Sequence, residues 1–349
     1  MRRYVPLIFI VCSILLILVS INTYWVYHTA TNNNQQITTI PRSKITVYST
    51  LPAPIAAAIA ADYEKFNRVK VNFVLLSRKA LIDKIKSKAK PLNGQADIIL
   101  ASENVLKQAV PENILSAVSS EQEDIIAGEF KDKNNLWTGI WYDPIIFCAN
   151  RDFLQGTSDI PRTWQELAAS KNVRIGITDF LASDTSANLF YALIDHYGED
   201  KAFFILRELH PHIVQYAKYL STPVRMAGMG EVDISIAVQS EAIKYLNNDY
   251  PLIIVYPEDG TYRQLTGAAL LRNAPNRTEA KRFLKWLLGD DVQICLQKNG
   301  FFFIPTNYST LTYKTFAVKN LTLFSDKQSL DDEQKALLLD RWVKTIRLQ

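Results

Sequence analysis

The feature that most constrains the fold of this chain is an alternation of strand-like and helix-like segments that starts near residue 44. Residues 44–49, "KITVYS", alternate apolar and polar side chains as a strand does, whereas Ile55, Ile59 and Tyr63 then repeat at helical spacing. Further strand candidates are residues 69–75, 97–101, 139–149, 173–178, 233–238, 252–256 and 267–271, with helix candidates at 78–89, 164–170, 187–197, 200–209 and 222–229. This alternation predicts an α/β protein with a largely parallel sheet.

Length and composition indicate a globular protein of two domains. The chain has 349 residues, and a typical domain has ~150. It is 48% hydrophobic and 21% charged, which is ordinary for a folded protein. The net charge of +4 is small for this length, and no stripe of Lys and Arg with interleaved aromatic residues occurs. These observations exclude nucleic acid as the main partner.

The N-terminus carries an export signal. Arg2 and Arg3 precede an apolar run over residues 5–21, and aromatic residues and a polar stretch follow. This order fits a segment whose N-terminus stays inside the cell, so the rest of the chain is expected outside the cytoplasm. Because no Ala-x-Ala cleavage site follows, a retained signal anchor over residues 1–27 is favoured over a cleaved signal peptide, with residues 28–43 as a tether. The membrane is then a partner through this segment.

The end of the first strand is a candidate ligand site. Ser49 and Thr50 stand at its carboxyl end, and a helix with Pro52 and Pro54 in its first turn follows at once. Hydroxyl groups beside the unpaired N–H groups of a helix N-terminus suit an anionic or hydrogen-bonding ligand. An ordinary turn with a Ser or Thr cap is the simpler alternative.

No catalytic motif is found in the sequence. His28, His196, His210 and His212 form no H-E-x-x-H pattern, and the sequence contains no G-x-S-x-G, P-loop or G-x-G-x-x-G motif. We therefore predict that the protein is not an enzyme and has no catalytic residues, no bound metal and no cofactor.

The order of six sequence blocks resembles a known family. The first five are "ITVYST…AIAADYEKF…VKVNFV", "ADIILAS", "WTGIWYDPIIFCANRDFL", "IPRTWQELA…RIGITD" and "STPVRMAGMGEVDISIAV". The sixth is the longest and runs "YPEDGTYRQLTGAALLRNAPNRTEAKRFLKWLLGDDVQICLQKNGFFFIPTN". Together they resemble the solute-binding proteins of ABC importers, the type II periplasmic binding proteins that include ferric-ion, polyamine, phosphonate and phosphoglycerate binders.

The resemblance implies two α/β lobes joined by a hinge of two crossing segments. Lobe 1 would take residues 44–145 and 252–307, and lobe 2 residues 146–251. Residues 308–349 lie beyond the resemblance, and their own helical pattern predicts a C-terminal helical extension. One small ligand would lie in the cleft between the lobes, outside the carboxyl ends of the strands. The partners implied are that ligand and an ABC permease.

Carried over position by position, the resemblance nominates residues at strand ends, helix starts and the crossing segments. The candidate ligand-binding residues are Ser49, Thr50, Ser102, Tyr142, Asp143, Ser183, Asp184, Thr185, Ser186, Gln239, Glu258, Gly260 and Thr261. Simpler roles stay open for several of them. Residues 183–186 can be an N-cap cluster, Tyr142 can pack at the hinge, and Glu258 and Gly260 can form a turn, while polar strand ends such as Gln239 usually face water.

The candidate residues favour an oxoanion, such as a phosphonate or phosphate ester, because hydroxyls at helix starts suit negative charge. Arg225 is the nearest basic candidate. A polyamine is the alternative, since Asp143, Asp184, Glu258, Trp141 and Tyr142 supply carboxylates and aromatic rings. Ferric ion is disfavoured, because Fe(III) binders of this group present adjacent tyrosines, whereas Tyr216 and Tyr219 are three residues apart.

The function expected from this resemblance is capture of a small ligand outside the cytoplasm and its delivery to an ABC importer. A ligand-sensing regulatory module of the same fold, signalling to a membrane partner, is the alternative.

Overall fold

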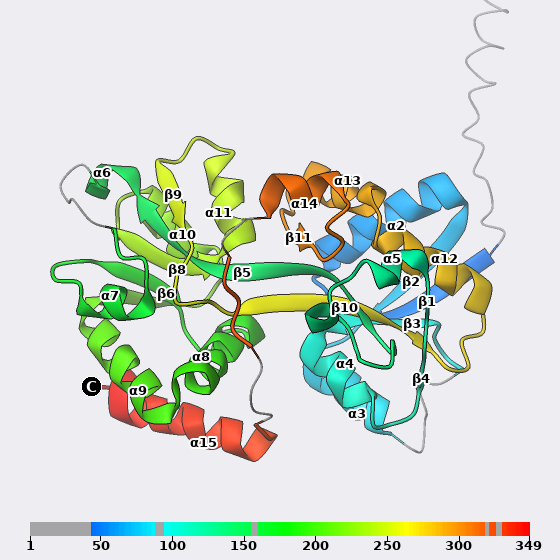
Figure 1. Ribbon diagram of the computed structural model, residues 1–349, viewed down its shortest axis with the longest axis horizontal. Coiled ribbons are helices and arrows are strands. Elements are labelled where there is room, and N and C mark those ends of the chain that lie inside the picture. The colour runs from blue at the N-terminus through cyan, green and yellow to red at the C-terminus, as the bar shows by residue number, and fades with distance from the viewer. Residues whose placement is uncertain (1–42, 88–93, 155–159, 318–320, 326–329) are drawn as a thin grey trace, which may run out of the picture. The chain divides into compact units, whose positions relative to one another are not determined.

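The computed structural model divides the chain into two compact units, Met1–Arg42 and Ser43–Gln349. It describes residues 43–87, 94–154, 160–317, 321–325 and 330–349, all in the second unit (Figure 1). The expected signal anchor, and all of the expected tether except Ser43, lie outside the described residues. Within the described part, no helix combines the length and the apolar character needed to cross a membrane.

Lobe 1 is built on a mixed sheet with the strand order β2-β1-β3-β10-β5. β1 is parallel to β2 and β3, whereas β10 is antiparallel to β3 and β5. The strands are β1 (Ser43–Ser49), β2 (Val69–Leu75), β3 (Ile98–Ser102), β4 (Leu115–Ser116), β5 (Thr138–Asn150), β10 (Arg263–Leu271) and β11 (Ile304–Pro305). The helices are α2 (Ala53–Asn67), α3 (Arg78–Lys86), α4 (Glu103–Ala109), α5 (Glu121–Asp124), a 3₁₀ turn (Gly128–Phe130), α12 (Arg277–Leu287), α13 (Asp290–Lys298) and α14 (Leu311–Phe316).

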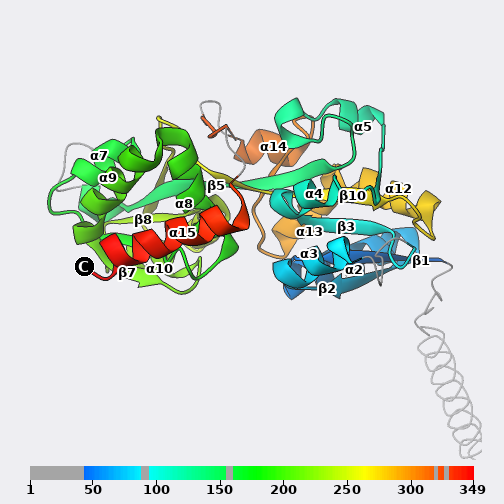
Figure 2. The same cartoon turned by 90° about the horizontal axis from the view of Figure 1, so that it is seen from below.

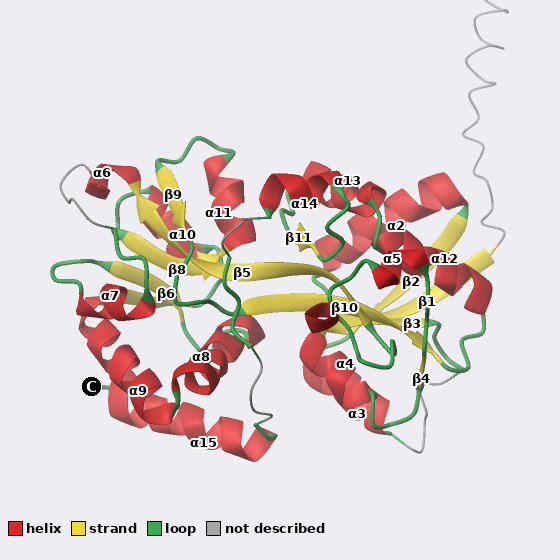
Figure 3. Ribbon diagram, viewed as in Figure 1, coloured by secondary structure: helices red, strands yellow, loops and turns green. Residues whose placement is uncertain are grey.

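Lobe 2 continues from the second half of β5 in the order β5-β8-β6-β7, with β9 on the other side of β5. Its strands are β6 (Ile175–Thr178), β7 (Ile213–Ala217), β8 (Ile234–Val238) and β9 (Leu252–Val255). Its helices are α6 (Arg151–Leu154), α7 (Trp164–Ala169), α8 (Asp184–Tyr197), α9 (Glu199–Leu209), a 3₁₀ turn (His210–His212), α10 (Thr222–Gly228), α11 (Gln239–Leu246), α15 (Asp332–Trp342) and a π-helical turn (Val343–Arg347). In Figure 3 the strands run through the middle of each lobe and helices lie around them.

The expected α/β class is confirmed, but the sheet is mixed instead of largely parallel. β6 is parallel to β7 and β8, as β1 is to β2 and β3. The antiparallel strands are those that connect the lobes: β5 leaves lobe 1 for lobe 2, and β10 brings the chain back beside it. Because the chain crosses to lobe 2 on β5 and returns beside it on β10, these two strands run in opposite directions.

β5 joins the two lobes as one buried strand of 13 residues. Tyr142 packs in the hydrophobic core of lobe 1, whereas Ile145 packs in a core of lobe 2. The lobe boundary on the return path differs from the expected one at residue 252. Leu252–Val255 pairs with the lobe 2 half of β5, with Ile254 opposite Cys148, so the chain recrosses only after Val255. The apolar side chains of this strand complete the lobe 2 cores.

A third segment also crosses between the lobes, where the resemblance implied two. After α14 the chain passes over the crossing strands at residues 321–325, and α15 then lies along lobe 2 beside α8 and α9 (Figures 1 and 2). A capping box between Asp331 and Gln334 fixes the start of α15. Trp342, which is fully buried, ties its end into the lobe 2 core.

Candidate functional site

A cavity of about 600 Å³ lies between the lobes, where strands of both sheets end. The carboxyl ends of the adjacent parallel strands β1, β2 and β3 supply its lobe 1 side through Thr50, Arg78 and Ser102. Lobe 2 contributes the start of α8 and the start of α11, and the crossing strands contribute Trp141, Asp143, Gln264 and Thr266. Of the thirteen expected site residues, six line the cavity, and they are Thr50, Ser102, Asp143, Ser183, Asp184 and Thr185.

The start of α2 leaves an open helix N-terminus at this cavity. Ser49 is fully buried, and its hydroxyl donates to Leu100 O at 2.6 Å and accepts from Leu51 N at 3.1 Å. Ser49 therefore holds the turn and, contrary to expectation, does not line the cavity. Pro52 is the N-cap, and no side chain caps α2. Pro54 has no N–H, and Ile55 N donates to Pro52 O at 3.1 Å. Ala53 therefore supplies the one N–H of the first turn that remains available, beside Thr50 and Pro52, which both line the cavity.

Arg78 was missed by the sequence reasoning and is the one basic residue among the described residues that line the cavity. Ser77 caps α3 by accepting from Ala80 N at 3.2 Å, which places Arg78 in the first turn. Its Nη1 lies 3.6 Å from Asp184 Oδ1 in lobe 2, too far for a hydrogen bond, and its Nε is buried with no hydrogen-bond partner. The guanidinium therefore has unused donors at the cavity.

The position of Arg78 carries a signal that the sequence reasoning did not use. Ser77 and Arg78 come shortly after β2, and Thr50 comes directly after β1. The last residues of the two strands, Leu75 and Ser49, are paired. The two strand ends therefore lie side by side. The expected basic candidate, Arg225, instead pairs with Glu231 at 3.1 Å and does not line the cavity.

Asp143 lies at the other helix start, that of α11. It is buried, and its carboxylate accepts from the backbone N–H of Ser240 at 2.9 Å and from its hydroxyl at 2.5 Å. Burial raises the pKa of Asp143 to about 7, and the bonds from Ser240 oppose this shift. The neighbouring Glu241 also lines the cavity, and its Oε2 is buried without a partner. This end of the cavity therefore offers hydrogen-bond acceptors.

One contact at the cavity and one outside it join lobe 1 to α8 of lobe 2. One is the Arg78 and Asp184 pair, and the other is a 3.2 Å hydrogen bond from Asn104 Nδ2 in α4 to Asn188 Oδ1 in α8. Apolar side chains cover part of the cavity wall, including Trp141, Phe301 and Phe303. Trp141 and Phe303 stack with their ring centres 5.6 Å apart, which fixes both rings.

Three expected residues point away from the cavity because of local geometry. Tyr142 lies between Trp141 and Asp143 on β5, so its side chain points to the face of the sheet opposite to theirs. There its ring stacks on that of Phe130, with ring centres 5.1 Å apart. Ser186 is buried and donates its hydroxyl to Asp179 O at 2.7 Å, so it closes the loop before α8.

Gln239 is also buried and does not line the cavity. It accepts from the Tyr256 hydroxyl at 3.0 Å and donates to Phe316 O at 3.5 Å. Its amide therefore joins α11 to the segments beside it.

The remaining three expected residues belong to the hinge and its surroundings. Glu258 is exposed and pairs with Arg162 at 3.3 Å. Gly260 adopts a positive φ of 101° in the crossing segment. Thr261 is fully buried, and its hydroxyl donates to Ile145 O at 2.7 Å. The hydroxyl that we expected to bind a ligand instead binds the neighbouring crossing strand.

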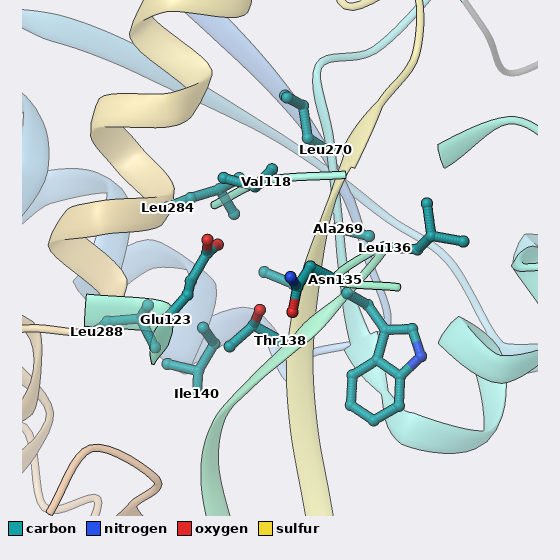
Figure 4. Close-up of a pocket in the computed structure, with 12 residues that line it drawn as sticks. Val118, Glu123, Asn135, Leu136, Thr138, Ile140, Ala269, Leu270, Leu284 and Leu288 are labelled. Atoms are coloured by element: carbon teal, nitrogen blue, oxygen red, sulfur yellow. The ribbon is translucent and has the colours of Figure 1, made fainter. Parts of the chain in front are cut away.

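A second cavity, of about 10 Å³, lies inside lobe 1 (Figure 4). Glu123 points into it among apolar side chains that include Val118, Leu284 and Leu288. Its Oε2 is buried without a partner, and burial raises the pKa of this carboxyl. The space is about that of one water molecule, so it is no ligand cleft. Across the described ranges, no group of three or more His, Cys, Asp or Glu residues is placed to hold a metal ion.

Two α/β lobes, joined by crossing strands around a polar cavity at their strand ends, define a class of proteins that bind small solutes between lobes. The chain belongs to the bacterial extracellular solute-binding proteins, whose family model matches residues 44–302. This is the type II periplasmic-binding-protein group that works with ABC transporters, so the resemblance seen in the sequence is confirmed. Nothing among the matches favours the regulatory alternative.

Relatives with known structures share the fold over most of the chain. The periplasmic binding protein AfuA from Actinobacillus pleuropneumoniae, solved with exogenous fructose-6-phosphate bound, is 27% identical with a TM-score of 0.69, covering 88% of this chain and all of that one. The ferric binding protein from Campylobacter jejuni is 19% identical with a TM-score of 0.65, covering 87% of this chain and 98% of that one. An uncharacterized protein of Haemophilus influenzae is 26% identical over 298 residues, 82% of this chain and 85% of that protein.

Proposed function

We propose that the protein captures a hydroxylated organic phosphate, or a related oxoanion ester, in the cavity between its lobes and delivers it to an ABC importer. The observation that carries this proposal is the guanidinium of Arg78, whose unused donors lie at the cavity beside the uncapped N-terminus of α2. Both groups are hydrogen-bond donors with positive charge or partial positive charge, and a phosphoryl group is a matching acceptor.

The phosphoryl end of the ligand is assigned to the strand ends of lobe 1. Thr50 and the N–H of Ala53 at the start of α2 lie next to the start of α3, because Ser49 pairs with Leu75 in neighbouring parallel strands. A helix N-terminus contributes about half a positive charge, and a charged hydrogen bond from Arg adds roughly 1.5–3 kcal/mol. A phosphoryl group bound to Arg78 would weaken the attraction between Arg78 and Asp184 across the cavity. This attraction is already weak, because the two groups are 3.6 Å apart.

The organic end is assigned to the start of α11. Asp143 and Glu241 offer carboxylate oxygens there, and Glu241 Oε2 lacks a partner. Carboxylates accept hydrogen bonds from hydroxyl or amino groups, whereas they would repel a second phosphoryl group. In Figure 1, α11 lies above β5 and α8 lies below it. The helix start that carries Glu241 and the helix start that carries Asp184 therefore lie on opposite sides of β5. The rings of Trp141 and Phe303 supply an apolar wall for the carbon skeleton.

The relatives support an organic phosphate among the oxoanions. AfuA, 27% identical over nearly the whole described unit, was solved with fructose-6-phosphate bound, a ligand with a phosphoryl group at one end and hydroxyls along its length. A cavity of about 600 Å³ lies within the usual range for small ligands.

Ferric ion is less well supported by the site. The tyrosines weighed for iron, Tyr216 and Tyr219, do not line the cavity. The Tyr216 hydroxyl and His210 Nδ1 share a 2.8 Å hydrogen bond. The Tyr216 ring lies under the Arg347 guanidinium, on the side of lobe 2 that α15 covers. A polyamine would use Asp143 and Asp184, but Asp184 already faces Arg78, whose positive charge would repel a polyamine.

The family and its solved relatives are binding proteins, and we infer that this chain likewise binds without catalysis. Its relatives act outside the cytoplasm, and we infer the same location here. Retention in the membrane through residues 1–27 stays a prediction.

Calorimetric titration of the purified protein tests the ligand class. We expect fructose 6-phosphate to bind, and fructose, which lacks the phosphoryl group, to show no binding over the same range. Binding of spermidine or ferric citrate, with no response to fructose 6-phosphate, inorganic phosphate or methylphosphonate, would overturn the proposal.

A further inference from the structure

The C-terminal segment makes contacts with both lobes within four residues, 321–324. Leu321 and Leu323 pack against the lobe 1 core, whereas Phe324 packs against the lobe 2 core. In Figure 1 this part of the chain, orange to red, runs across β5 and β10. The lobe boundary therefore falls between Leu323 and Phe324 on this segment, as it falls between Tyr142 and Ile145 on β5.

All three crossing segments meet at Thr261. Its hydroxyl donates to Ile145 O of β5 at 2.7 Å. Its backbone N–H donates to Thr322 O at 3.0 Å, and its carbonyl accepts from Phe324 N at 2.8 Å. The C-terminal segment is therefore joined to the second crossing segment by an isolated parallel bridge between Leu323 and Thr261, at the point where the lobes join.

Phe324 fixes this segment to lobe 2. Its ring stacks on His196 of α8, with ring centres 4.2 Å apart and planes inclined by 19°. Gly260 allows this close approach, because a Cβ atom at that position would lie 2.9 Å from the Phe324 ring. A side chain larger than hydrogen at residue 260 would push the ring away.

The segment is also held further along the chain. Trp342 in α15 is buried against Phe180, with ring centres 4.9 Å apart, and Arg347 pairs with Asp179 at 3.1 Å. On the other side, α14 is attached to lobe 1 through Tyr313 and Phe316, which pack against the lobe 1 core. Residues 321–325 are thus anchored in both lobes and cannot move with one lobe alone.

We propose that residues 321–325 are a third hinge segment that restricts how far the cleft opens. A hinge opens by changing backbone angles in a few residues of the segments that cross it. A further crossing segment that is hydrogen-bonded to the other two must change its backbone angles together with them. It therefore narrows the range of rotation between the lobes. Phe324, anchored on lobe 2 next to Gly260, is the residue on which this restraint depends. The inference does not depend on the identity of the ligand.

Spin-label distance measurements between the lobes test this hinge without ligand. Labels are placed at Lys79→Cys in α3 and Lys218→Cys in lobe 2, both exposed positions, with Cys12→Ser in every variant; Cys148 and Cys295 are buried. We expect a narrow distance distribution in the parent protein and a broader one, shifted to longer distances, in Phe324→Ala. Leu337→Ala, an exposed position on α15, is the matched control and should not change the distribution.

A Phe324→Ala distribution that superimposes on that of the parent would overturn the proposal. Circular dichroism establishes whether the variant is folded. If Phe324→Ala does not fold, Phe324→Leu replaces it, because it keeps an apolar side chain and loses the stacking on His196. A broader distribution in Phe324→Leu then supports the third hinge segment, and an unchanged one contradicts it. Neither result bears on whether a phosphate ester binds.

Discussion

The hydroxyl of Thr261 donates a 2.7 Å hydrogen bond to the carbonyl oxygen of Ile145, and this bond joins two of the strands that cross between the lobes. Thr261→Val keeps the shape of the side chain but removes the donor in a fully buried place. We expect the free energy of unfolding to fall by roughly 1–3 kcal/mol. Urea denaturation measures this loss, and Thr261→Ser, which keeps a hydroxyl, should lose less. Equal stability of the Val variant and the parent protein would show that the bond contributes nothing.

Arg78→Gln is predicted to weaken binding of a phosphate ester. The substitution removes the positive charge and most of the donors at the cavity, and a charged hydrogen bond contributes roughly 1.5–3 kcal/mol, equivalent to about 10- to 100-fold in affinity. Calorimetry with fructose 6-phosphate measures the change. Arg162→Gln is the control, because Arg162 is exposed and pairs with Glu258 outside the cavity. Equal losses in both variants would argue against a specific role for Arg78.

Asp143 predicts a pH dependence of stability. Its folded pKa, about 7, lies above the ordinary value of 3.8 because burial disfavours the charged form. The folded state therefore holds this proton more tightly than the unfolded state does. The contribution to stability is fully present below about pH 4 and is lost as the pH rises toward about 7.

Asp143→Asn carries no titrating group at this position. Between pH 5 and pH 8 we expect the parent protein to lose more stability than Asp143→Asn, measured by urea denaturation at both values. Parallel changes in the two proteins would mean that Asp143 titrates at its ordinary pKa.

Glu123 predicts a gain in stability on substitution. Its carboxyl is buried among apolar side chains in lobe 1, with Oε2 unpartnered (Figure 4). Because burial raises its pKa, the ionised form that dominates at high pH costs folding free energy. Glu123→Leu should raise stability at pH 8 by roughly 1–3 kcal/mol. Glu121→Leu, exposed on the same helix, should change it by less than about 0.5 kcal/mol. A destabilised Glu123→Leu would refute this account of the cavity.

The sequence predicts the α/β class and the places where strands end, because periodicity reflects burial directly. The sequence also predicts that the side chains of Tyr142 and Asp143 face opposite sides of the sheet, because the two residues are neighbours on one strand. The position of Arg78 is harder to predict, because a lone Arg after a strand usually faces water. Its role follows from the register of β1 with β2, which brings two strand ends together, and from the approach of Asp184 in another lobe.

The hinge residues show a different limit of the sequence. Gly260 and Thr261 are residue types expected in a ligand-binding turn. In the structure, both contact segments more than 60 residues away, because Gly260 lies against Phe324 and Thr261 donates to Ile145 O. Such contacts depend on tertiary arrangement and leave no local pattern. The C-terminal helix was visible in the sequence, but its attachment to lobe 2 through Trp342 was not.

The most direct test of the proposed function observes the phosphoryl group itself. In a ³¹P NMR titration, the resonance of fructose 6-phosphate should shift and broaden when the parent protein is added, because its phosphoryl oxygens accept hydrogen bonds from Arg78 and the start of α2. With Arg78→Gln at the same concentration, the resonance should stay close to its free position. A resonance that the parent protein leaves unchanged, or that Arg78→Gln shifts as strongly as the parent does, would contradict a phosphate site at this end of the cavity.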